Sequence, residues 1–124
     1  MTLSGDWQPT VVIADAYIDP DRFIFEGVDT SRYPTWTVGE TAKVFFAKSP
    51  SWLRSQERCG RLSIPGEEPI QPKRRVQNNA RFFCLEDIEF ISHSLAYHGV
   101  ISGVKLRLTL VMLKAQGQLW GYIA

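Results

Sequence analysis

Hydrophobic positions in the first half of the chain recur at helical spacing. Val38, Ala42 and Phe45 stand at i, i+4 and i+7, which places them on one face of a helix. Thr37 and Glu40 have the spacing of a capping box, in which two side chains satisfy backbone N–H groups at a helix start. The pattern therefore predicts a short helix that begins at Thr37-Val38.

A second helix is predicted directly after a break. Ser49 is a good N-cap, and Pro50 costs nothing at the first helical position because the N–H that it lacks has no helical partner there. Gly60 stands where a left-handed C-terminal cap is expected, so the helix would span about Pro50–Arg58. We expect Leu53 and Cys59 to be its inward-facing residues.

The rest of this second helix is polar. Its remaining circumference carries short hydroxyl and guanidinium side chains: Ser51, Arg54, Ser55 and Arg58. Arginine on a helix can pair with guanine edges or phosphates in the major groove of DNA. An ordinary solvated helix face explains the same residues, since helix-turn-helix elements also occur in proteins that bind no DNA. The helix alone leaves both interpretations open.

A hairpin with a cationic tip is predicted after the second helix. Two segments that could pair as strands, Arg61–Ile64 and Ala80–Cys84, are separated by turn signals rich in proline, glycine and asparagine. Lys73-Arg74-Arg75 lies between them, so residues 65–80 would form a basic wing. A disordered, solvated loop is the alternative, and ordering of this loop upon DNA binding would reconcile the two.

Two further helices are predicted in the C-terminal part. The first is predicted over residues 85–97 and ends at His98-Gly99. Its apolar stripe consists of Ile88, Ile91 and Leu95. A last helix, from Ser102 or Gly103 to about Gln116, is apolar on two opposite faces. One face carries Val104, Leu108, Val111 and Ala115, and the other carries Leu106, Leu110, Leu113 and Gly117. One face can close the core, and the other is left for a second copy or for the N-terminal segment.

Residues 1–35 form an acidic extension in which strands are possible. Val11–Ile13 and Phe23–Phe25 are β-rich runs, and Asp19-Pro20-Asp21 between them is a turn signal. The extension could cover the last helix, mediate dimerisation or stay partly loose. Its acidic residues argue against a position along DNA, so we place it away from the basic part of the chain.

The charges are separated along the sequence. The whole chain has a net charge of only +1, from 14 basic and 13 acidic residues. Residues 43–81 carry nine basic residues against three acidic ones, whereas residues 1–40 carry seven acidic residues against two arginines. Phosphate contacts supply most of the non-specific affinity for DNA, so the location of the positive charge matters more than its sum.

Other chemistries find little support. With 124 residues, 44% of them hydrophobic, the chain can fill one core. We expect Cys59 and Cys84 to be buried thiols, and the spacing of His93 and His98 does not fit a helical metal site. We therefore expect no enzymatic activity, no cofactor and no metal. The longest apolar run near the C-terminus, residues 110–113, is far shorter than a membrane span, and no signal peptide is recognisable, so we expect a cytoplasmic protein.

The stretch from residue 37 to residue 88 resembles the DNA-binding domain of MerR-type transcriptional regulators and the related winged-helix excisionases of phages and mobile elements. The matching runs are TVGETAKVFFAKSPSWLRSQERCGRL and ARFFCLEDIEFI. The positions that fall on the family pattern are Thr37, Glu40, Ala42, Ser49, Leu53, Arg54, Glu57, Gly60, Arg81, Phe82, Phe83, Asp87 and Ile88. The resemblance implies a mainly α fold with a small β wing. A winged helix-turn-helix would occupy residues 36–98, and residues 99–124 would form a helix for core closure or dimerisation.

The resemblance also implies how the chain would contact DNA. A recognition helix over residues 50–59 would enter the major groove with Ser51, Arg54 and Arg58, while Arg75 and Arg81 of the wing would contact the backbone. The full candidate DNA-binding set is Lys48, Ser49, Ser51, Arg54, Ser55, Arg58, Lys73, Arg74, Arg75 and Arg81. We expect a small regulator that binds double-stranded DNA sequence-specifically, as a homodimer through the C-terminal helix. The alternatives are an excisionase-like architectural factor and a winged-helix module that binds a protein partner instead of DNA.

Overall fold

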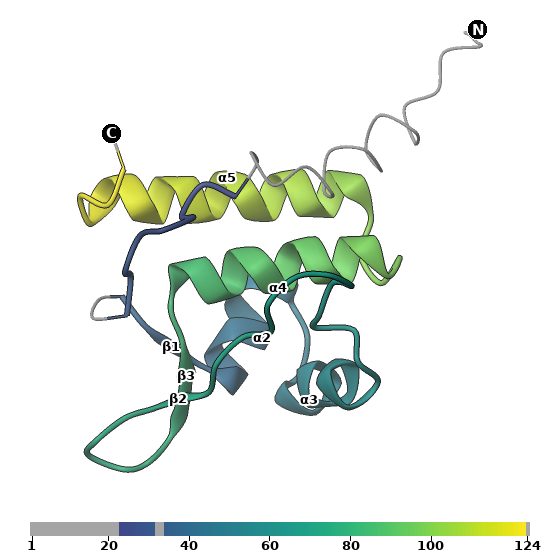
Figure 1. The fold of residues 1–124 in the computed structure, drawn as a ribbon, viewed down its shortest axis with the longest axis horizontal. Coiled ribbons are helices and arrows are strands. Elements are labelled where there is room, and N and C mark those ends of the chain that lie inside the picture. The colour runs from purple at the N-terminus through teal and green to yellow at the C-terminus, as the bar shows by residue number, and fades with distance from the viewer. Residues whose placement is uncertain (1–22, 32–33, 124) are drawn as a thin grey trace, which may run out of the picture.

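The computed structural model describes residues 23–31 and 34–123, which form a mainly helical fold. The elements in these residues are β1 (Trp36–Thr37), α2 (Val38–Phe46), α3 (Pro50–Arg58), β2 (Lys73–Arg74), β3 (Arg81–Phe83), α4 (Leu85–Tyr97) and α5 (Gly103–Leu119). In Figure 1, α5 and α4 lie side by side, and α3 and the hairpin lie on the side of α4 away from α5. Helix α2 packs against α3 and also contacts α5. Helix α4 therefore lies between α5 and the part of the fold that contains α3 and the hairpin.

The predicted break between α2 and α3 is confirmed. The Glu40 N–H donates to the Thr37 hydroxyl at 3.1 Å, and the Thr37 N–H donates to the Glu40 carboxylate at 2.8 Å, which completes the capping box. Helix α2 ends at Ala47, whose φ of 55° is left-handed. Helix α3 starts after Ser49, whose hydroxyl accepts the N–H of Trp52 at 3.2 Å. The two helices are thus joined by a turn of three residues.

The C-terminal end of α3 confirms one prediction and corrects another. Gly60 adopts a φ of 73°, as expected for a left-handed residue after a helix. Leu53 is buried as predicted, but Cys59 is exposed. The helix ends at Arg58, so Cys59 is a cap residue outside the buried stripe, and Gln56 occupies the interior instead.

The sheet differs from the predicted hairpin. Strand β3 is central, with β1 and β2 antiparallel on either side, and Lys73 pairs with Phe82. The prediction of a strand over Arg61–Ile64 is wrong, since these residues form a turn and a loop. Leu62 is buried, and the Ser63 carbonyl lies 2.8 Å from His98 Nε2. These contacts hold the loop against the helical core, away from β3.

Helix α4 lies at the centre of the core. It covers the predicted residues, and its stripe of Ile88, Ile91 and Leu95 is fully buried. Leu106 and Leu113 of α5 are buried as well, which confirms that one apolar face of α5 closes the core. The last helix extends to Leu119, three residues beyond the predicted end, because Gly117 stays helical.

The segment that leads into β1 is part of this core. Phe25 is fully buried, and its ring lies against Gly117 so closely that a Cβ there would be 2.8 Å from Phe25 Cε1. The predicted strand Phe23–Phe25 is not formed, and residues 24–27 make a turn. The N–H groups of Ile24 and Phe25 donate to the carboxylate of Glu89 on α4, so they are not available for hydrogen bonds to another strand. The other predicted strand, Val11–Ile13, lies outside the described residues.

The buried Glu89 makes stability depend on pH. Burial raises its pKa from 4.5 to about 7, against the opposing effect of the two backbone N–H groups. The unfolded chain releases this proton at a lower pH than the folded chain does. The free energy of unfolding is therefore expected to fall by on the order of 3 kcal/mol as the pH rises from about 4.5 to about 7.

Urea unfolding from pH 4.5 to pH 7.5 measures the pH dependence that Glu89 causes, and Glu89→Gln should flatten the profile. The exposed Glu67→Gln is the control. A profile that Glu89→Gln leaves unchanged would contradict the assignment.

Candidate nucleic-acid interface

A groove separates α3 from the sheet. It has a volume of about 600 Å³ and is lined by the start of α2, one side of α3, and residues of β2 and β3. The charged residues in its lining are Arg54, Glu57, Arg58, Arg74 and Arg81. Four arginines face one glutamate across elements that are distant in sequence, so the groove is positively charged.

One ion pair bridges the groove and fixes α3 to the sheet. Both Arg81 Nη atoms donate to the two Glu57 carboxylate oxygens at 2.7 Å. The Arg81 guanidinium also lies over the Phe83 ring, 5.0 Å from its centroid. The hydrogen bond from Arg81 holds the pKa of Glu57 below its usual value. Glu57 is therefore neutralised locally, and Arg81 serves as a brace between two elements.

Arg54 and Arg58 are the unengaged cations of the groove. Both are exposed on α3, and neither makes a hydrogen bond or ion pair within residues 23–31 and 34–123. Ser51 shares this exposed face and lies 3.1 Å from the Ser49 hydroxyl. Ser55 is only half-exposed, and Ser49 itself is committed to capping α3. The free hydrogen-bonding capacity of the helix thus lies mainly in its two arginines.

The Lys73-Arg74-Arg75 triplet is split by the strand that contains it. Successive side chains of a strand point to opposite faces, so Lys73 and Arg74 face different sides of the sheet. Arg74 is exposed at the groove, where its guanidinium donates to the Asn79 carbonyl at 3.1 Å. Arg75 reaches Thr35 at 3.3 Å and lies 4.0 Å from Glu40. The triplet therefore does not form one cationic tip.

Lys73 is engaged by the start of α4. Its ammonium donates to both carboxylate oxygens of Asp87, at 3.0 and 2.9 Å. Burial lowers the pKa of Lys73, but the hydrogen bonds and the negative charge of Asp87 outweigh this effect, and the net pKa is raised. Asp87 also accepts the Cys84 N–H at 3.0 Å, as the capping residue of α4. The pair ties β2 to α4.

The other side of β2 is acidic. Lys73 lines a second pocket, of about 460 Å³, whose carboxylates are Glu26, Glu67, Glu68, Glu86, Asp87 and Glu89. A phosphate backbone would be repelled there. The sheet consequently separates a basic groove from an acidic pocket, a division that the charge count along the sequence did not show.

The tip of the hairpin is exposed and uncharged. The Arg75 N–H donates to the Ala80 carbonyl at 2.8 Å and closes the loop, in which Asn79 has a left-handed φ of 58°. Val76 at the tip is 98% exposed. The hairpin covers residues 73–83 and is shorter than the predicted wing over residues 65–80. The Gln77-Asn78-Asn79 turn signal located its tip correctly.

Lys48 completes the basic surface near α3. It lies exposed in the turn between α2 and α3, with its ammonium 5.8 Å from the centroid of the Trp52 ring. This weak cation–π contact orients the side chain and leaves its charge available to solvent.

The described residues contain no metal-binding cluster, and one of the two cysteines, Cys84, is buried. No group of three or more histidine, cysteine or acidic residues there has a metal-binding arrangement. Burial raises the pKa of Cys84 to about 12, which keeps its thiol protonated and unreactive. No helix in residues 23–31 and 34–123 has the length and hydropathy to cross a bilayer.

Comparisons with known proteins give no family for this chain. No protein-family model, no curated protein and no solved structure matches it.

Proposed function

We propose that this protein binds double-stranded DNA as a winged helix-turn-helix. The observation that carries the proposal is the basic groove between α3 and the hairpin. In it, Arg54 and Arg58 are exposed beside Arg74 and have no partner among the residues that the structure describes. An exposed helix after a three-residue turn, flanked by a hairpin on the same side, is the arrangement that winged helix-turn-helix proteins use on a duplex.

In the proposed complex, α3 enters the major groove. Arg54 and Arg58 contact guanine edges or phosphates, and Ser51 contributes a hydroxyl. Lys48, in the turn, lies near the phosphate backbone, and Arg74 reaches it from the wing. Lys73 and Arg81 act as internal braces instead of DNA contacts, since both are held by carboxylates.

Selection of binding sites from random duplexes tests this function. The full chain should enrich a short motif, and its affinity should fall with salt by a log–log slope of about −0.9 per phosphate contact. The stoichiometry on the selected site distinguishes a symmetric regulator from an assembly on direct repeats. Absence of enrichment, or binding without salt dependence, would refute DNA as the ligand and favour a protein-interaction module.

Lys73→Ala and Arg74→Ala form a matched pair that separates bracing from DNA contact. Loss of Lys73 leaves Asp87 without its partner, so the free energy of unfolding should fall by about 1–2 kcal/mol, with a small effect on DNA affinity. Arg74→Ala removes an exposed charge, so it should weaken DNA binding and leave stability nearly unchanged. Urea unfolding and fluorescence anisotropy measure the two quantities. A reversed pattern would show that Lys73 is the contact residue.

A further inference from the structure

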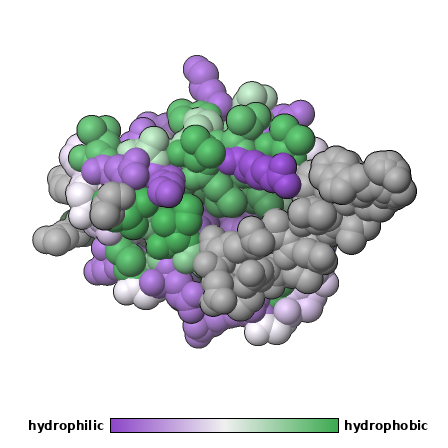
Figure 2. All heavy atoms as spheres, turned by 90° about the horizontal axis from the view of Figure 1, so that it is seen from above, coloured by the Kyte–Doolittle hydropathy of each residue, from purple (hydrophilic) through white to green (hydrophobic). Residues whose placement is uncertain are grey.

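The face of α5 that points away from α4 is strongly apolar and exposed. Val104, Leu108 and Val111 are 58%, 57% and 66% exposed and stand at i, i+4 and i+7. Leu119 and Trp120 continue the apolar surface at the end of the helix. Figure 2, viewed from the α5 side, shows hydrophobic side chains gathered among hydrophilic ones. A contiguous apolar surface of this kind is typical of an interaction site.

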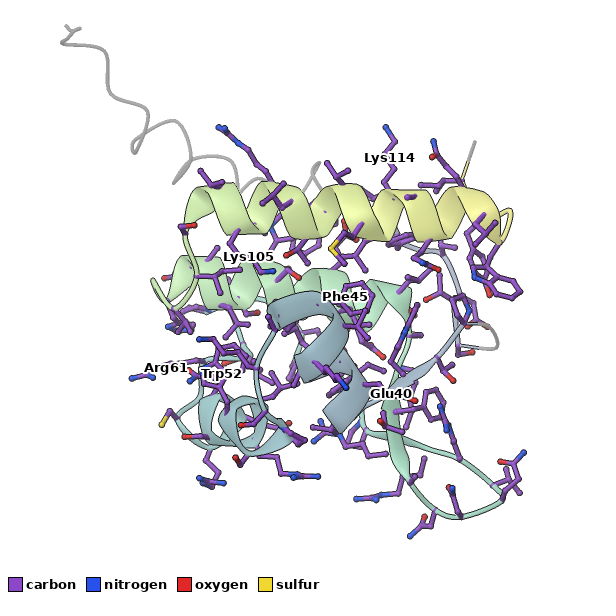
Figure 3. All side chains as sticks on the ribbon, turned by 180° about the vertical axis from the view of Figure 1, so that it is seen from behind. Glu40, Phe45, Trp52, Arg61, Lys105 and Lys114 are labelled. Carbon is purple, nitrogen blue, oxygen red and sulfur yellow. The ribbon has the colours of Figure 1, made fainter. Side chains whose placement is uncertain are left out.

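The charged residues of α5 are all positive. Helix α5 contains Lys105, Arg107 and Lys114 and no acidic residue. Arg107 and Lys114 flank one edge of the apolar stripe, and Figure 3 shows Lys114 pointing away from the body of the molecule. A second copy packed face to face would bring two sets of like charges together, which is unfavourable. The surface therefore suits an apolar partner with negative charge.

Residues 1–22 have this composition. They contain four aspartates against one arginine, a net charge of −3 that matches the +3 of α5. Their apolar residues include Trp7, the run Val11–Ile13, and Tyr17-Ile18.

The segment also ends in a suitable place. Phe23, the next residue, lies against α4 with its ring centroid 4.4 Å from that of His93, and Phe25 packs on Gly117 of α5. Residues 1–22 can extend up to about 70 Å, whereas α5 is roughly 25 Å long, so they can reach its whole length.

We propose that residues 1–22 cover the outer face of α5 in the same chain. Their apolar side chains pack on Val104, Leu108 and Val111, and their aspartates pair with Arg107 and Lys114. Because the chain enters the fold near Gly117, the aspartates closest to Phe23 lie beside Lys114 and the earlier ones beside Arg107. The contact buries the apolar face without dimerisation and is independent of DNA binding.

Paramagnetic relaxation in the full chain tests this contact. A nitroxide at position 111, introduced as Val111→Cys with Cys59→Ser, should reduce the NMR signal intensities of residues 1–22. The same label at the wing tip, through Val76→Cys, should leave them unchanged. The joint Arg107→Glu and Lys114→Glu variant should restore the intensities, whereas Lys43→Glu on α2 should not.

Three outcomes would overturn the proposal. Full intensity for residues 1–22 with the label at position 111, in a monomeric chain, would leave the face open to a partner protein. Intensity loss in a mixture of labelled and isotope-enriched chains, together with a dimer mass in ultracentrifugation, would assign the face to a second copy. Intensity loss that the charge reversal does not relieve would remove the electrostatic basis.

Discussion

Replacement of Arg54 and Arg58 by alanine together is expected to weaken DNA binding on the order of a hundredfold. Both guanidinium groups line the groove, and neither has a partner within residues 23–31 and 34–123, so their hydrogen-bonding capacity is available to DNA. If both reach phosphates, the salt slope should also become smaller by about two. Fluorescence anisotropy on the selected site, at several salt concentrations, measures the affinity and the slope.

The matched control removes the same amount of charge from the opposite side of the molecule. Arg107 and Lys114, changed to alanine together, are residues of α5, and Figure 1 shows α4 between α5 and the α3 and hairpin elements that line the groove. This variant should lose affinity only through its smaller net charge, by much less than the groove variant. Equal losses would mean that binding depends on total charge, and the groove would no longer be the site. Since Arg54 and Arg58 are exposed, unfolding should not obscure the comparison.

The helix boundaries were the most predictable part of the fold, because local chemistry determines them. The Thr37 and Glu40 side chains, the Ser49-Pro50 pair and the left-handed Gly60 each act within a few residues, so the sequence contains the whole interaction. The same reasoning placed Arg54 and Arg58 on the exposed side of α3. Their functional role stays a prediction.

The sheet and its charges were harder to predict because they depend on partners distant in sequence. Strand β2 has only two residues and no apolar alternation, so nothing local marks it as a strand. Lys73 pairs with Asp87 and Arg81 with Glu57, over separations of 14 and 24 residues. A count of charges along the chain could not show that these cations are already neutralised.

Cys59 shows why a helical pattern can predict burial wrongly at the end of a helix. At helical spacing it belongs to the inward side, but the helix ends at Arg58, and the next residue leaves the stripe. Element boundaries are uncertain by a few residues in any sequence-based prediction, and burial at these positions is uncertain with them. The interior position was taken by Gln56, a polar residue that the apolar pattern did not include.

The N-terminal part of the chain is less separate from the fold than its acidic composition indicated. Phe25 is fully buried against α5, and the Ile24 and Phe25 N–H groups are held by Glu89. A side chain larger than that of glycine at position 117 would collide with the Phe25 ring. A glycine inside a helix lowers helix stability, so its presence here reflects this close approach. The sequence contained both residues, but no local pattern connects positions that are 92 residues apart.

Phe25→Ala is therefore expected to lower the free energy of unfolding by about 3–5 kcal/mol, the range for loss of a buried phenylalanine. Phe23→Ala, which removes a half-buried ring from the same segment, should lower the free energy of unfolding clearly less.

Gly117→Ala should also be destabilising, because its Cβ would lie 2.8 Å from Phe25 Cε1. In the Phe25→Ala background, Gly117→Ala should be much less destabilising, since the added Cβ then meets only the Ile123 side chain, at 3.1 Å, and alanine is the better helix former. Urea unfolding of the four chains gives the coupling between the two positions. Additive effects would show that the ring does not occupy the space over Gly117, and the segment before β1 would then lie outside the core.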